Sequence, residues 1–112
     1  MAIELRYYQT AAGEKPFVEW LQGLKDRQAR TRDSRRASPA SQLAISAGEG
    51  VLELRIDWGP GYRVYFARLG QVVVLLLCGG DKRAQQKDID RAKAYLEDYK
   101  ARTTRKKPRG RR

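Results

Sequence analysis

The sequence predicts an α+β fold in which a small antiparallel sheet packs against helices that precede and follow it. The first observation is a run of three strand-like segments between residues 51 and 77. The second is a pair of helical apolar stripes, one before this run and one after it. Alternating hydrophobicity indicates strands, and apolar residues spaced three and four apart indicate helices. Strands grouped in the chain, with helices at the ends, are typical of α+β domains.

The N-terminal part predicts one strand, one helix and an irregular segment. Residues 3–8 alternate loosely, as a strand does. Residues 15–28 predict a helix. Its apolar stripe is made by Phe17, Trp20, Leu21 and Leu24. Proline and serine residues then break any periodicity in 29–48, so we predict a short helix that decays into a loop.

The central and C-terminal parts predict three strands and a closing helix. Residues 51–58 and 62–69 alternate and are joined by a Gly-Pro-Gly turn, as expected of a hairpin. Residues 72–77 are apolar on both faces, so this strand is expected to be the most buried. Gly79 and Gly80 then open a loop, and residues 85–99 carry the stripe of a final helix.

The net charge of +11 and the pI of about 10.2 indicate an anionic partner. Residues 100–112 contain eight Lys or Arg and no acid, so residues 1–99 carry only +3. We therefore divide the chain into a domain over residues 1–102 and a basic tail over 103–112. The tail is expected to be disordered and could bind nucleic acid without sequence preference.

Several functional classes are disfavoured. The chain has no histidine, so acid–base chemistry would depend on Lys, Arg, Asp or Tyr, and no metal or cofactor motif is present. The single cysteine, Cys78, ends an apolar run and is expected to be a buried core thiol. The N-terminus is too polar for a signal peptide, and the longest apolar run is too short for a membrane helix. We expect a cytoplasmic protein with no cofactor.

A row of polar residues on the predicted hairpin is the best candidate site. Arg55, Arg63 and Tyr65 should share one open face, because a hairpin preserves its faces. Arginine matches phosphate oxygens with a planar fork, and tyrosine can stack on a base. The alternative is a solvated face with surface ion pairs such as Arg55–Asp57 or Glu53–Arg63.

The Gly79–Arg83 segment is a second candidate. Backbone amides between a strand and a helix N-terminus can hold an anion, and Lys82 and Arg83 would reinforce this. The alternative, equally weighted, is a plain strand-to-helix turn in which Asp81 caps the helix.

Residues 48–99 resemble the RelE/ParE superfamily of type II toxins, and most closely its HigB-like branch of addiction module killer proteins. The specific strings are GPGYRVYF and LLLCGGDK, and residues 17–30 match the first helix of that branch. The resemblance implies a compact RelE-like fold, with a small antiparallel sheet against N-terminal helices and a C-terminal helix. It also implies a ribosome-dependent mRNA endonuclease that is neutralised by a cognate helix-turn-helix antitoxin.

In that class, the RNA 2′-hydroxyl attacks the adjacent phosphate without a metal. The resemblance assigns Arg63 to phosphate stabilisation, with Arg55 and Lys82 as further catalytic groups. Tyr65, Asp81 and Arg83 would contact the RNA.

Residues 31–47 depart from the family pattern. Relatives carry a second helix rich in Arg and Leu followed by a turn, and neither is present here. The segment is similar to one translated out of frame, although divergence explains it equally well. We expect a domain less stable than its relatives. Two alternative functions therefore stay open, namely a ParE-like toxin acting on DNA gyrase and a decayed toxin that retains only antitoxin binding.

Overall fold

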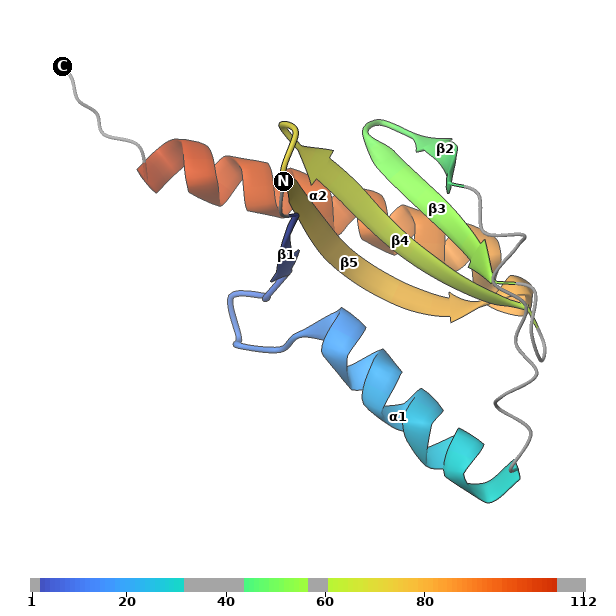
Figure 1. Cartoon of the computed structure of the whole chain (residues 1–112). Helices are drawn as coiled ribbons and strands as arrows, with labels where there is room; N and C mark the ends of the chain where they lie inside the picture. The colour runs from blue at the N-terminus through green and yellow to red at the C-terminus, as the bar shows by residue number, and fades with distance from the viewer. Residues whose placement is uncertain (1–2, 32–43, 57–60, 107–112) are drawn as a thin grey trace, which may run out of the picture.

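The computed structural model describes residues 3–31, 44–56 and 61–106, with side chains described outside 25–31 and 104–106. It is an α+β fold, as predicted, with a five-stranded sheet and two long helices (Figure 1). In chain order the elements are β1 (Glu4–Tyr7), α1 (Pro16–Thr31), β2 (Ala44–Gly48), β3 (Val51–Ile56), β4 (Tyr62–Leu69), β5 (Val73–Asp81), η3 (Lys82–Ala84) and α2 (Gln85–Lys106). Within the described ranges, no helix is both long and apolar enough to span a membrane.

The sheet has the strand order β1-β5-β4-β3-β2 and is mixed. β3 pairs with β4 and β4 pairs with β5 in antiparallel orientation, as expected, and β2 is antiparallel to β3. β1 is parallel to β5, with Glu4 opposite Val73 and Tyr7 opposite Leu76, so the prediction of a purely antiparallel sheet was wrong. β2, β3 and β4 all lie between β1 and β5 in the chain, although β1 and β5 are neighbours in the sheet. Local sequence patterns do not reveal such a long-range pairing.

The two helices lie on opposite faces of the sheet (Figure 1). A Cβ placed on Gly79 would meet the ring of Trp20 in α1, and one placed on Gly80 would meet Asp88 in α2. Successive Cβ atoms of a strand point to opposite faces, so α1 covers one face of β5 and α2 covers the other. The strand predicted to be the most buried is therefore sandwiched between helices.

The main core lies between the sheet and α2. Its buried members are Tyr8, Val51, Tyr65, Ala67, Leu75, Leu77, Cys78, Ala92 and Leu96. Tyr62 and Val64, on the α1 face, are also buried, as the alternation predicted. The alternation grouped the residues by face correctly, but the prediction that the face of Tyr65 is open was wrong, because α2 covers that face.

Several element limits differ from the predicted ones. Residues 44–48 form β2, which pairs with β3 and was predicted as loop. β5 continues to Asp81, so Gly79 and Gly80 belong to the strand and do not open a loop. α2 continues to Lys106, so the first residues of the predicted basic tail are helical, while residues 107–112 lie outside the described part. Most of the atypical 31–47 segment also lies outside it.

Tyr8 fastens the second half of α2 to the end of β1. Its hydroxyl donates to Asp98 Oδ2 at 2.5 Å, and Arg102 Nε donates to the same oxygen at 3.0 Å. The Arg102 guanidinium also lies over the Tyr8 ring, 5.6 Å from its centroid. Burial, and then the Asp98 carboxylate, raises the pKa of Tyr8 to about 12. Burial and Glu53 likewise raise the pKa of Tyr65.

These two tyrosines predict a loss of stability in alkali. Unfolded tyrosine ionises near pH ~10, whereas the folded state holds both protons to higher pH. Protons are therefore released on unfolding, and the free energy of unfolding should fall as the pH rises from about 10 to about 12. Urea unfolding across this range measures the effect. Tyr8→Phe should show a shallower fall than wild type, and equal slopes would contradict the assignment to Tyr8.

Candidate functional site

A buried carboxylate, Glu53, organises the residues predicted as the site. β3 and β4 place Glu53 opposite Tyr65 and Arg55 opposite Arg63. Glu53 is 3% exposed; its Oε1 accepts from Arg55 Nε at 3.1 Å. Its Oε2 accepts from the Tyr65 hydroxyl at 3.1 Å and from Gln85 Nε2, at the start of α2, at 2.7 Å. The sequence correctly predicted that Arg55, Arg63 and Tyr65 share one face. It did not predict that all three contact Glu53.

Arg63 is held less completely than its neighbours. Its Nε lies 3.4 Å from Glu53 Oε2, close enough for an ion pair. The geometry of this contact is not that of a hydrogen bond. Among the side chains that the structure describes, Arg63 Nε is the buried polar atom that has no hydrogen-bond partner. Buried polar atoms are usually satisfied, so an exception invites a functional explanation. The Glu53–Arg63 pair that we considered as an alternative is present, but it is buried, with Arg63 13% exposed.

Tyr65 does not lie on an open face. Its side chain is fully buried in the main core, and its hydroxyl is used by Glu53. A ring without exposed surface cannot stack on a base in this conformation. The prediction that Tyr65 is available to RNA was wrong in its placement, because α2 covers this part of the sheet.

Asp81 has the capping role that we considered as the alternative for the Gly79–Arg83 segment. It precedes η3, and its Oδ1 accepts from the Arg83 backbone N–H at 3.0 Å. Burial opposes ionisation, but the hydrogen bonds from Arg83 outweigh it and lower the pKa of Asp81. Arg83 also pairs with Asp81 through Nη2 at 3.3 Å, and its own side chain is 84% exposed. Asp81 thus shapes the turn, and Arg83 remains accessible.

Lys82 approaches Arg63 at the turn between β3 and β4. The Lys82 backbone N–H donates to the Gly61 carbonyl at 3.0 Å. A Cβ built on Gly61 would lie 3.4 Å from Lys82 Cδ and 3.9 Å from Arg63 Nη1. The two cationic side chains therefore flank the same glycine, whose φ of +86° requires a residue without a Cβ.

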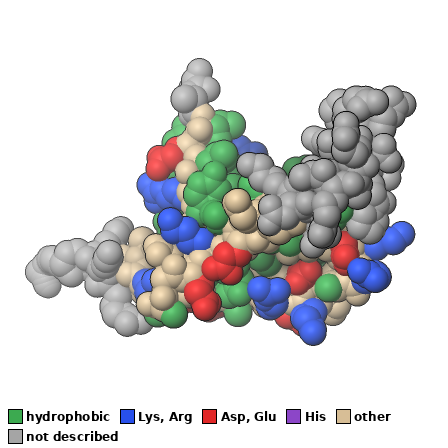
Figure 2. Space-filling view, turned by 90° about the horizontal axis from the view of Figure 1, so that it is seen from below, with side chains coloured by type: hydrophobic (Ala, Val, Ile, Leu, Met, Phe, Trp, Pro, Cys, Tyr) green, Lys and Arg blue, Asp and Glu red, His purple; other side chains and the backbone are tan. Residues whose placement is uncertain are grey.

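The three predicted catalytic residues thus gather at one end of the sheet. Arg55 near the end of β3 and Arg63 at the start of β4 face each other across the hairpin, and Lys82 joins them from the segment after β5. Figure 2 shows Lys and Arg side chains, with acidic ones among them, at the right-hand end of the molecule, where β5 leads into α2 in Figure 1. Arginine and lysine grouped in this way can hold a phosphate.

Cys78 is the buried core thiol that the sequence predicted. Its side chain is 1% exposed, and the Sγ atom lies 3.7 Å from the Asp88 carbonyl. Burial raises the pKa of the thiol to about 12. A protonated, covered thiol is a poor nucleophile, so Cys78 is not a candidate for covalent chemistry.

Comparison with known proteins places the chain beside one relative. Over 86 residues it is 41% identical to a protein of Haemophilus influenzae (strain ATCC 51907 / DSM 11121 / KW20 / Rd) described as "Uncharacterized protein". The match covers 73% of this chain and 87% of that protein. No protein-family model matches the chain, and no solved structure matches it. The extent and identity of the match show that the chain belongs to the same family as the Haemophilus influenzae protein.

Proposed function

We propose that this protein is a type II toxin of the RelE/ParE superfamily, in its HigB-like branch, that cleaves mRNA in the ribosomal A site. The observation that carries the proposal is the convergence of Arg55, Arg63 and Lys82 at one end of the sheet. The proposal includes a cytoplasmic location and a cognate helix-turn-helix antitoxin, and it builds on the motif resemblance of residues 48–99.

The chemistry would proceed through attack of a 2′-hydroxyl on the adjacent phosphate. Negative charge then develops on the phosphate oxygens, where fixed cationic donors have their largest effect. Arg63, braced by Glu53, is the residue that we assign to this charge. Arg55, which is half exposed, would bind the neighbouring phosphate, and the exposed Lys82 ammonium is suited to protonating the leaving oxygen.

One observation favours a role in binding without cleavage. Glu53 pairs with both Arg55 and Arg63, so part of their charge is neutralised inside the protein. A site built for rate acceleration would be weakened by this pairing, whereas a protein that retains only antitoxin binding would not. The decayed toxin is therefore the second candidate, and the cleavage experiment separates the two.

The test is cleavage of a defined mRNA on purified translating ribosomes, mapped by primer extension. We expect cuts within the A-site codon, and we expect Arg63→Ala to lower the rate by about 10²–10³-fold, the effect typical of removing one donor to a developing oxyanion. Arg68→Ala is the matched control, because Arg68 is an exposed arginine near the other end of β4 and should leave the rate unchanged. Cuts that persist in Arg63→Ala would remove Arg63 from the mechanism. A folded wild-type protein that makes no cuts would favour the binding role.

A further inference from the structure

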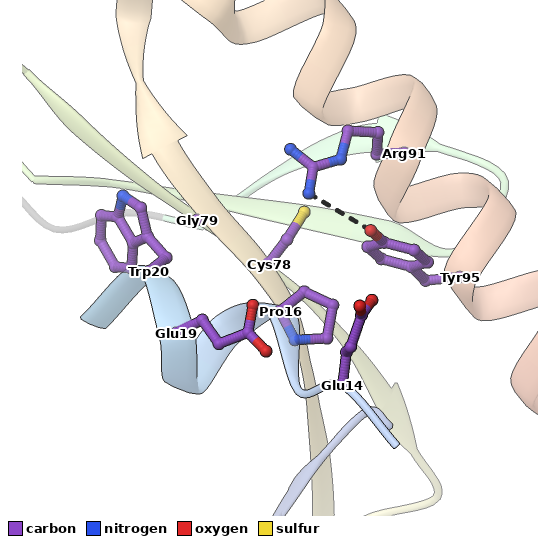
Figure 3. A pocket seen from close by; sticks show the side chains of 8 residues that line it. All are labelled: Glu14, Pro16, Glu19, Trp20, Cys78, Gly79, Arg91 and Tyr95. Carbon is purple, nitrogen blue, oxygen red and sulfur yellow. Dashed lines mark hydrogen bonds between the residues drawn. The ribbon is translucent and has the colours of Figure 1, made fainter. Parts of the chain in front are cut away.

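A pocket lies where β5 extends beyond β1. β1 pairs with β5 over Val73–Leu76, and a last backbone bond joins the Tyr8 N–H to the Leu76 carbonyl at 3.0 Å. Past this point, β5 borders a pocket of about 310 Å³ whose walls come from the start of α1, from β5 and from α2 (Figure 3). This volume is at the lower end of the range for small-molecule sites, so the pocket fits one compact group.

The unbalanced charge of this pocket is negative. Figure 3 shows the carboxylates of Glu14 and Glu19 projecting into the space that Arg91 and Tyr95 border from the opposite side. Neither carboxylate forms a hydrogen bond or ion pair with a described side chain. Arg91, by contrast, is engaged, because its Nη1 lies 3.2 Å from the buried Asp88 carboxylate. Two free acids therefore face a cation that already has its counterion, in a chain with a net charge of +11.

The remaining walls suit a cation on an apolar stem. Trp20 and Pro16 line the α1 side, and Tyr95 lines the α2 side. The Arg91 guanidinium lies 5.8 Å from the centroid of the Tyr95 ring and donates to its hydroxyl at 3.2 Å, so Tyr95 is engaged by Arg91 and the apolar walls left for a stem are Pro16 and Trp20. The Cys78 thiol is covered and neutral, so it contributes no charge.

We propose that this pocket binds an ammonium or guanidinium group carried on an unbranched alkyl stem. The charged head pairs with Glu14 and Glu19, and the methylenes pack against Pro16 and the Trp20 ring. The group can belong to a free alkylamine or to a lysine or arginine side chain of another protein, because both present the same chemistry. The proposal is independent of RNA cleavage, since it uses none of the residues assigned to that reaction.

Titration of the full chain with butylammonium and butylguanidinium, followed by amide and indole NMR shifts, tests the proposal. We expect saturable shifts at the Trp20 indole and at Gly79 and Tyr95, with Kd in the millimolar range. N-acetyl-lysine methylamide is the second arm; tighter binding than butylammonium would identify a protein side chain as the source. Butanol and butyrate are the neutral and anionic controls. Preference for butyrate would overturn the proposal and make the pocket an anion site of Arg91.

Matched variants distinguish binding in the pocket from nonspecific attraction between the ligand and the charged protein surface. Glu14→Gln and Glu19→Gln should each weaken butylammonium binding about 3–5-fold, the size expected for one partly exposed ion pair. Glu97→Gln removes an exposed acid from α2, away from the pocket, and should leave the affinity unchanged. Equal weakening in all three variants, or shifts that never saturate, would show nonspecific attraction and refute the site. Because all three positions are exposed, unfolding does not confuse the comparison.

Discussion

Replacing Glu53 with glutamine is expected to lower the free energy of unfolding by about 2–4 kcal/mol, which is a large share of the stability of a small domain. Glu53 is 3% exposed and accepts from Arg55, Tyr65 and Gln85 while it pairs with Arg63. Glutamine keeps the shape but removes the charge, and its NH₂ group would point at donors. Buried donors left without an acceptor cost far more than the net value of the bonds they made. Arg55 is half exposed, so its share of the loss is small.

Urea unfolding of Glu53→Gln beside Glu97→Gln measures this effect. Glu97 is an exposed acid on α2 without a partner among the described side chains, so its replacement should change stability by less than about 0.5 kcal/mol. A loss below about 1 kcal/mol in Glu53→Gln would mean that water already satisfies the cluster. In that case the cluster would be open to solvent and better suited to a ligand than to holding the fold.

The same residue shows where prediction from sequence reached its limit. Alternation identified the strands of the hairpin and placed Arg55, Arg63 and Tyr65 on one face, which the register confirms. It could not say which face α2 covers, because that depends on a helix that begins only at Gln85, after a further strand. Glu53 was visible as a carboxylate among arginines. Its burial is a tertiary effect, because it depends on the packing of α2 against this face.

The connection from β1 to β5 and the strand β2 were missed for related reasons. β1 is short and its residues are exposed, so its pattern gives no information about its partner. β2 has the sequence AISAG, in which Ile45 is the single β-branched residue and small residues make up the rest, so its pattern is weak and its pairing with β3 gives it order. The strands β1, β3, β4 and β5 were thus predictable from their own residues, whereas the strand β2 and the pairing of β1 with β5 depend on a neighbour and were not.

Gly79 and Gly80 have neighbours that leave no room for a Cβ, so replacing either glycine is expected to destabilise the protein strongly. Each of Gly79→Ala and Gly80→Ala should lower the free energy of unfolding by about 1–3 kcal/mol or more, the cost typical of overpacking. A methyl group on Gly79 would overlap the Trp20 ring, and one on Gly80 would overlap an Asp88 carboxylate oxygen. Neither neighbour can move easily. The Trp20 ring is packed between Phe17 and Tyr62, and Asp88 is 4% exposed and bound by Arg91.

Gly23→Ala is the internal control and should have the opposite sign. A Cβ on Gly23 would meet nothing within 4 Å, and the residue lies inside α1, so alanine should stabilise the protein by about 0.5–1 kcal/mol. Urea unfolding of the three variants compares the same chemical change at three sites. A double-mutant cycle then locates the cause, because Gly79→Ala should cost much less when Trp20 is already leucine. If the cost of Gly79→Ala is unchanged in that background, the Trp20 ring is not its cause, and the glycine is needed for its backbone in β5.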